Sequence, residues 1–285
     1  MRIDRRTFAA LCTSTAALSA LAGRGLSGLR LGVTDWNLRL TGKVEAVEIA
    51  KRIGFEGVEV SLGRQVSDGK LPLDDTGKIA AYKQAFAQHS FRPAGTCLDV
   101  LHVHYLKSDP LGERFVSDGV RITKQLGARV MLLPFFGKGA IEAQGEQERV
   151  GDVLRNVAPE AERAGIILGL EDTISAEANV RIMDRARSAA VKTYYDVGNS
   201  TRAGFDPVRE IEWLGRKRIC QFHLKDNPGY LGDGSIRFPD VLRAISRIGF
   251  EGFANLETDS PSKQVEPDMK RNHAFIRKLM AEVGS

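Results

Sequence analysis

From Leu29 onward, the chain alternates short apolar runs with amphipathic stretches, eight of each. The apolar runs are rich in aliphatic and β-branched residues, as is typical of strands that are covered on both faces. They lie at 30–36, 56–62, 93–101, 129–136, 166–172, 191–197, 218–225 and 251–257. The stretches between them have helical periodicity and lie at 43–53, 76–89, 113–126, 146–164, 177–189, 206–216, 238–248 and 267–283. This pattern predicts an α/β fold, a (β/α)8 TIM barrel that forms a single domain.

The connections favour a barrel over a doubly wound open sheet, which is the competing architecture. No G-x-G-x-x-G motif follows the first expected strand, so the sequence gives no support for a dinucleotide-binding sheet. The hexapeptide Arg-Ile-Gly-Phe-Glu-Gly at 52–57 recurs at 247–252, each time between a helix and a strand. Such a repeat fits a barrel built of similar units. Several helices are expected to stop at a glycine before the next strand, at Gly54, Gly127, Gly165 and Gly249.

The first 22 residues have the three parts of an export signal in the expected order. The pair Arg5-Arg6 precedes Thr7-Phe8, a mildly apolar run extends over 9–22, and Ala20-Leu-Ala22 resembles a cleavage site. We therefore expect a twin-arginine signal peptide at 1–22, a barrel at 23–285, and a periplasmic or extracellular location. The run is too short to remain as a membrane anchor in the mature form. A frayed N-terminal helix of a cytosolic protein is the alternative.

The net charge of +5 does not indicate a nucleic-acid partner. Arg2, Arg5 and Arg6 supply part of it, and the rest of the chain has no basic block interleaved with aromatic residues. The two cysteines beyond the signal, Cys97 and Cys220, fall in different expected strands and are predicted to be buried free thiols.

Four potential metal ligands stand at the ends of the last four expected strands: Glu171, Asp196, His223 and Glu257. They are spaced by about one strand–helix unit, so a barrel would bring them together on its carboxyl-terminal rim. Three carboxylates and an imidazole around one point repel each other unless a cation lies between them. Oxygen-rich ligation with one nitrogen predicts one divalent metal, with Mn²⁺ preferred and Mg²⁺, Co²⁺ or Zn²⁺ as alternatives.

At these motifs the chain resembles the sugar phosphate isomerase/epimerase family of xylose-isomerase-like TIM barrels, and most closely its metal-dependent ketose epimerases. The resemblance covers nearly the whole body and is most specific at Glu171, Asp196, His223-Leu-Lys-Asp226 and Glu257. It implies that the four residues bind the metal and that Glu171 and Glu257 also act as acid and base. Barrels of this group often pair through rim loops, which is compatible with a homodimer.

Further residues are candidates for substrate binding. The related epimerases have a histidine three residues after the strand-six aspartate, whereas this chain has Asn199, which can donate a hydrogen bond but cannot shuttle a proton. Lys225 should project from the same strand face as His223, and either holds a substrate oxygen or pairs with a carboxylate. Four more residues near strand ends are expected to face the rim: His102, His104, Trp36 and Glu59. The two histidines alternate, so they could also bind a second metal.

These features predict an isomerase or epimerase acting on a small sugar or a related polyol ketone through an enediolate. Because the same proton abstraction also begins β-elimination, a lyase or dehydratase acting on a keto-sugar, 3-keto-glycoside or inosose is the alternative. An abasic-site nuclease would need a cluster of histidines, and the chain has only five in all. A sugar-binding protein without catalysis is the remaining alternative, which the two intact glutamates argue against.

Overall fold

A computed structural model describes residues 26–226 and 228–284, and its strands close into one parallel barrel in sequence order. The expected signal peptide lies outside the described residues. The strands are β1 (Leu29–Thr34), β2 (Gly57–Ser61), β3 (Arg92–Cys97), β4 (Val130–Pro134), β5 (Ile167–Glu171), β6 (Val191–Asp196), β7 (Ile219–Leu224) and β8 (Gly252–Leu256). Pairing of β1 with both β2 and β8 completes the ring. The predicted (β/α)8 barrel is confirmed.

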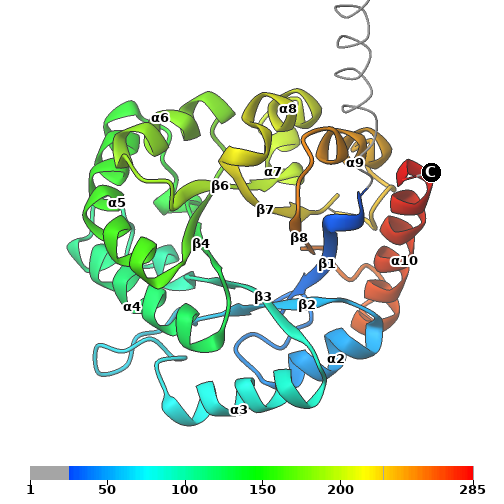
Figure 1. The fold of residues 1–285 in the computed structure, drawn as a ribbon, viewed down its shortest axis with the longest axis horizontal. Coiled ribbons are helices and arrows are strands. Elements are labelled where there is room, and N and C mark those ends of the chain that lie inside the picture. Colours follow the sequence, from blue (N-terminus) through cyan, green and yellow to red (C-terminus); the bar gives the residue numbers. More distant parts are fainter. Residues whose placement is uncertain (1–25, 227, 285) are drawn as a thin grey trace, which may run out of the picture.

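Helices surround the barrel, as Figure 1 shows along its axis. The α-helices are α2 (Glu45–Ile53), α3 (Thr76–Gln88), α4 (Pro110–Leu126), α5 (Gln144–Ala164), α6 (Ala176–Ala186), α7 (Val197–Arg202), α8 (Pro207–Arg218), α9 (Phe238–Arg247) and α10 (Val265–Gly284). Short 3-10 helices are η1 (Leu26–Gly28), η2 (Asp99–His102) and η3 (Gly137–Gly139). None of the helices within the described ranges combines the length and the apolar content that crossing a bilayer requires.

Glycines end several helices as predicted. Gly54 closes α2 with a φ of 114°, and Gly127 and Gly165 close α4 and α5, also in the left-handed region that side chains with a Cβ disfavour. Gly249 has a φ of 63° just after α9. The two copies of the repeated hexapeptide thus make the same helix-to-strand turn before β2 and before β8, on either side of β1.

Side-chain alternation along the strands separates the outer core from the barrel interior. In β4, Met131 and Leu133 join the large core beneath the helices, whereas Val130 and Leu132 belong to a smaller cluster. Because successive strand residues point to opposite faces, this smaller cluster fills the interior. It also contains Cys97, which is buried, while Cys220 is partly buried and packs against it; both cysteines are free.

Two elements differ from the sequence expectation near the rim. β3 ends at Cys97, and residues expected to extend that strand form η2 instead. After β6, the chain forms the additional short helix α7, for which Asp196 is the N-cap: its Oδ1 accepts hydrogen bonds from the backbone N–H groups of Gly198 and Asn199. Both elements bring residues to the carboxyl-terminal rim.

Candidate metal centre and active site

The four predicted ligands meet on the inner face of the barrel rim. Glu171 and Asp196 are the last residues of β5 and β6, His223 is the penultimate residue of β7, and Glu257 directly follows β8. Their neighbours in sequence, such as Leu170, face the outer core, so strand alternation turns all four inward. One ligand atom from each lies within 4.8 Å of every other.

His223 Nδ1 is at the centre of this group. It lies 2.9 Å from Glu171 Oε1, 3.5 Å from Glu257 Oε2 and 3.7 Å from Asp196 Oδ2. The ammonium of Lys225 approaches from the rim, 2.7 Å from Asp196 Oδ2 and 2.5 Å from Glu257 Oε2. Lys225 therefore pairs with two rim carboxylates, one of the two roles expected for it.

The residues present fit a divalent cation. Asp196 Oδ2 is buried and no hydrogen bond of favourable geometry reaches it, although the positive charge of Lys225 lies close by. This oxygen therefore retains an acceptor site that a cation could occupy, and a cation would add to the charge compensation that Lys225 provides. Three carboxylates and one imidazole are also a donor set that Mn²⁺ and similar ions accept. Glu171, Asp196, His223 and Glu257 could together hold one ion.

The proton affinities of these groups depend on one another. Burial raises the pKa of Glu171, although His223 opposes the rise. Burial also acts to raise the pKa of Asp196, but the charge of Lys225 and the contact with His223 outweigh it and hold that pKa well below its usual range. Burial lowers the pKa of His223, but Glu257 and Glu171 together raise it well above its usual value. The arrangement thus favours positive charge at its centre.

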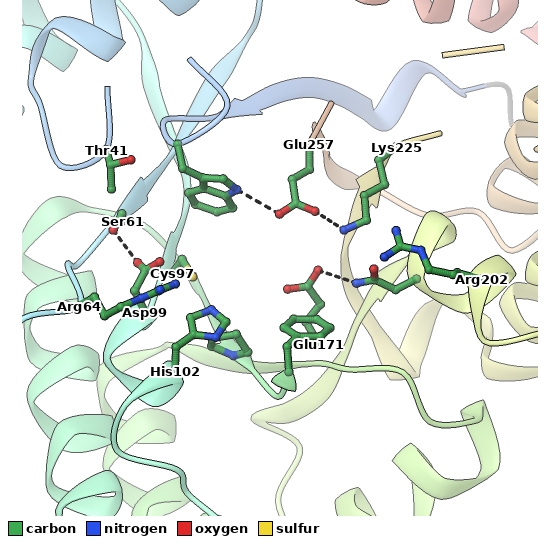
Figure 2. Close-up of a pocket in the computed structure, with 14 residues that line it drawn as sticks. Thr41, Ser61, Arg64, Cys97, Asp99, His102, Glu171, Arg202, Lys225 and Glu257 are labelled. Carbon is green, nitrogen blue, oxygen red and sulfur yellow. Dashed lines mark hydrogen bonds and ion pairs between the residues drawn. The ribbon is translucent and has the colours of Figure 1, made fainter. Parts of the chain in front are cut away.

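A pocket of about 640 Å³ opens above these residues, within the size range of small-molecule sites. Figure 2 shows Glu171 and Glu257 pointing toward each other across it. Four of the residues predicted to bind substrate line it: Trp36, His102, Asn199 and Lys225. The other lining residues are Thr41, Ser61, Arg64, Cys97, Asp99, Pro134, Phe136 and Arg202, together with the two glutamates.

Comparison with known families identifies the family to which this barrel belongs. A family model described as a xylose isomerase-like TIM barrel matches residues 47–279. The chain belongs to the xylose isomerase-like TIM barrel family. A relative from Actinoplanes sp., 2-epi-5-epi-valiolone 7-phosphate 2-epimerase, is 26% identical over 204 residues, which cover 70% of this chain and 73% of that protein.

Solved structures of two sugar epimerases share the fold. The D-psicose 3-epimerase of Clostridium cellulolyticum H10 matches with a TM-score of 0.74 at 16% identity, covering 88% of this chain and 99% of that one. The 3-keto-D-glucoside 4-epimerase of E. coli matches with a TM-score of 0.70 at 17% identity and the same coverage of both chains. At these identities the likeness establishes the architecture alone.

Two pocket residues contact the glutamates directly in this xylose isomerase-like barrel. The indole Nε1 of Trp36 donates to Glu257 Oε1 at 3.0 Å. The amide Nδ2 of Asn199 donates to Glu171 Oε1 at 3.4 Å, a long hydrogen bond. Asn199 occupies the position where the resemblance led us to expect a histidine, and it touches the carboxylate itself as well as lining the pocket.

Glu59 and His104 are not where the sequence analysis placed them. Glu59 was expected at the rim, but its side chain is fully buried in the barrel below His223, because Val58 and Val60 face the outer core and turn it inward. Its carboxylate accepts hydrogen bonds from Tyr194 Oη at 2.8 Å and Asn255 Nδ2 at 3.0 Å.

His104 turns away from the pocket. Its Nδ1 lies 2.7 Å from Oδ2 of Asp109, the N-cap of α4, and its ring lies 5.1 Å from that of Phe115. The ring of His102 instead stacks at 6.2 Å on Phe136 at the pocket wall. The alternation expected of a strand fails here because this segment is a 3-10 helix and a turn, so the two histidines do not form a second metal site.

Sequence reasoning did not identify several polar residues of the site. Tyr194, Gln221 and Asn255 form a buried network with Glu59 under the candidate ligands, and strand alternation in β6, β7 and β8 was the signal that could have found them. Asp99 and the arginines Arg64 and Arg202 lie outside the strands, in η2, in the loop after β2 and at the end of α7, where no local pattern marked them.

Proposed function

We propose that this protein is a metal-dependent epimerase or isomerase of a sugar or related polyol ketone. The observation that supports it best is the pair of glutamates, Glu171 and Glu257, which point toward each other at a sugar-sized pocket and are also two of the four candidate ligands. Relatives named as sugar epimerases support the reaction class. In this proposal one glutamate removes the proton next to the ketone, and the other returns a proton to the resulting enediolate.

Glu171, Asp196, His223 and Glu257 would hold the cation, with Mn²⁺ as the expected ion. When bound, it would supply a Lewis acid that stabilises negative charge on the substrate oxygens. His223 contributes its Nδ1, because its Nε2 faces Glu59. Lys225 would remain close enough to the rim carboxylates to limit their mutual repulsion.

The two glutamates have different surroundings, which suits them to complementary roles. Glu171 is 3% exposed, lies 2.9 Å from His223 Nδ1 and accepts a hydrogen bond from Asn199. The side chain of Glu257 is 18% exposed and accepts hydrogen bonds from Trp36 and Lys225. Trp36 and Asn199 would therefore fix the orientation of the two carboxylates rather than transfer protons.

Solvent-exchange measurements test the proposal against elimination. The Mn²⁺-loaded protein is incubated in D₂O with a panel of ketohexoses, 3-keto-glycosides and their phosphorylated and carboxylate-bearing counterparts, and the products are analysed by NMR and mass spectrometry. An epimerase incorporates deuterium next to the ketone of a sugar that is otherwise unchanged in composition. Loss of water or of an aglycone would assign the protein to the lyases, and absence of both reactions with every ketone would refute the proposal.

We also propose export through the twin-arginine route, on the evidence of the sequence motif alone. Substituting Arg5→Lys and Arg6→Lys together preserves charge but removes the paired guanidinium groups that the motif requires. The double variant should stay in the cytoplasm while the natural chain reaches the periplasm, as followed by cell fractionation. Equal periplasmic amounts of both would contradict export by this route.

A further inference from the structure

The pocket contains more basic side chains than the candidate metal centre uses. Lys225 is committed to Asp196 and Glu257, at 2.7 and 2.5 Å. Arg64 and Arg202 also line the pocket, and neither takes part in the group of four ligands. Figure 2 shows them on opposite sides of the pocket in that view.

Arg64 has an acidic neighbour. Figure 2 shows it beside Asp99, whose carboxylate accepts a hydrogen bond from Ser61 Oγ at 2.5 Å. Burial raises the pKa of Asp99, and the charge of Arg64 is among the influences that oppose the rise. Burial and the charge of Arg64 also lower the pKa of His102, which favours its neutral form. The charges on this side of the pocket therefore compensate each other.

Arg202 lacks such an acidic neighbour among the residues that the structure describes. Within residues 26–226 and 228–284, its guanidinium makes no ion pair and no hydrogen bond, and its side chain is exposed at the pocket. Its own helix, α7, contains no acidic residue. A cation at the edge of a pocket raises the local concentration of anionic ligands.

The helix places Arg202 at a useful distance from the reacting groups. Asn199 and Arg202 are three residues apart in α7, so they share one face and are about 4.5 Å apart along its axis. Asn199 contacts Glu171, and Arg202, three residues farther along α7, lines the same pocket. The carbon chain of a hexose spans such a separation.

We propose that Arg202 binds an anionic group, a carboxylate or a phosphate, at the far end of the sugar whose ketone reacts between Glu171 and Glu257. The guanidinium can donate two parallel hydrogen bonds to either group, which makes it selective for such planar or tetrahedral oxyanions. A neutral sugar would leave this charge in solvent. The inference rests on the proposed function for the position of the ketone, but the binding of the anion does not depend on turnover.

Binding of unreactive polyols tests the inference separately from catalysis. Sorbitol, sorbitol 6-phosphate and gluconate share a six-carbon chain and lack a ketone, so none can be epimerised by proton abstraction. Their affinities for the Mn²⁺-loaded full chain are measured by calorimetry at low and high salt. We expect phosphate or carboxylate to improve binding over sorbitol about tenfold or more, and salt to reduce the difference. Tighter binding of sorbitol 6-phosphate would identify phosphate as the anionic group, and tighter binding of gluconate would identify carboxylate.

Two arginine variants decide whether Arg202 is responsible. Arg202→Gln should reduce the preference for the charged polyol at least tenfold, whereas Arg209→Gln, the same charge change on α8 outside the pocket lining, should retain it. Equal affinity of the natural chain for all three polyols would overturn the inference, as would an unchanged preference in Arg202→Gln. Charge-selective binding without turnover of any ketone would instead refute only the proposed function.

Discussion

Glu59 Oε2 lies 2.9 Å from His223 Nε2, while Nδ1 on the other side of the same imidazole faces Glu171. Both side chains are fully buried, so this contact has no competition from solvent. A carboxylate that accepts from Nε2 leaves the Nδ1 lone pair free to bind a cation. Glu59 is therefore a positioning residue for the candidate ligand His223.

Substituting Glu59→Gln should weaken Mn²⁺ binding about ten- to a hundredfold, because the neutral amide stabilises the ligand form of the imidazole less well. Calorimetric titration of the apo protein with Mn²⁺ measures the effect without relying on activity. Glu45→Gln, an exposed glutamate on α2, is the matched control and should bind as the natural chain does. Unchanged affinity in a folded Glu59→Gln protein would remove Glu59 from this role.

Glu257→Gln should lower kcat at least a hundredfold, because the amide can neither accept nor return a proton. The variant should keep its fold, since Glu257 lies just beyond β8 and is partly exposed. Glu251→Gln, at the opposite end of the same strand, provides a control with the same chemical change. Comparable kcat values for the two variants would exclude Glu257 as acid or base.

Removing the cation should lower the melting temperature, because binding to the folded state alone stabilises it. At a free Mn²⁺ concentration a hundred times the dissociation constant, the stabilisation is about 2.7 kcal/mol. A chelator should reverse it, and Asp196→Asn should reduce the Mn²⁺-dependent shift in the melting temperature. Thermal unfolding with and without Mn²⁺ makes the comparison, and a shift of full size in Asp196→Asn would argue that the ion binds elsewhere.

The contact between α2 and α10 should make stability depend on acid pH. Hydrogen bonds from Arg52 and Lys270 lower the pKa of Glu266 to about 2 from an unfolded value near 4.5. A lowered folded pKa gives stability that is complete above about 4.5 and is lost as the pH falls toward about 2. The pair is largely exposed, so the contribution is no more than about 1 kcal/mol.

Urea unfolding at pH 7 and pH 3 checks this contribution. Glu266→Gln should be less stable than the natural chain at pH 7, and the difference should be clearly smaller at pH 3, where the unfolded carboxyl is protonated and the folded one has begun to titrate. Glu251→Gln, which changes an exposed glutamate just before β8, should follow the natural chain at both values. A constant difference between Glu266→Gln and the natural chain would show that the ion pair does not titrate in this range.

The rim residues could be predicted because one strand–helix unit separates each from the next. Spacing alone places Glu171, Asp196, His223 and Glu257 together once a barrel is assumed. The buried polar network beneath these four residues could not be predicted in the same way. Glu59 meets Tyr194 and Asn255 across separations of 135 and 196 residues, and only the closed sheet defines which inward-facing positions lie opposite each other.

Loop residues were the least predictable part of the site. We expected His102 and His104 to point to the same side, as residues two apart do in an extended strand. The chain instead forms η2 here, in which residues two apart do not share a face. Arg202 depends on α7, a six-residue helix that begins at an N-cap formed by a candidate ligand, Asp196. The position of Arg202 therefore depends on how the rim folds. A helix this short has no apolar periodicity from which the sequence could predict it.

The ammonium of Lys225, held between Asp196 and Glu257, bears on the order of events during biogenesis. Because the chain carries its own counter-charge for two of the rim carboxylates, the barrel can close before any ion arrives. If the proposed ion binds, it would take over part of the neutralisation that the lysine provides. Folding need not wait for the supply of metal in whichever compartment the chain is made.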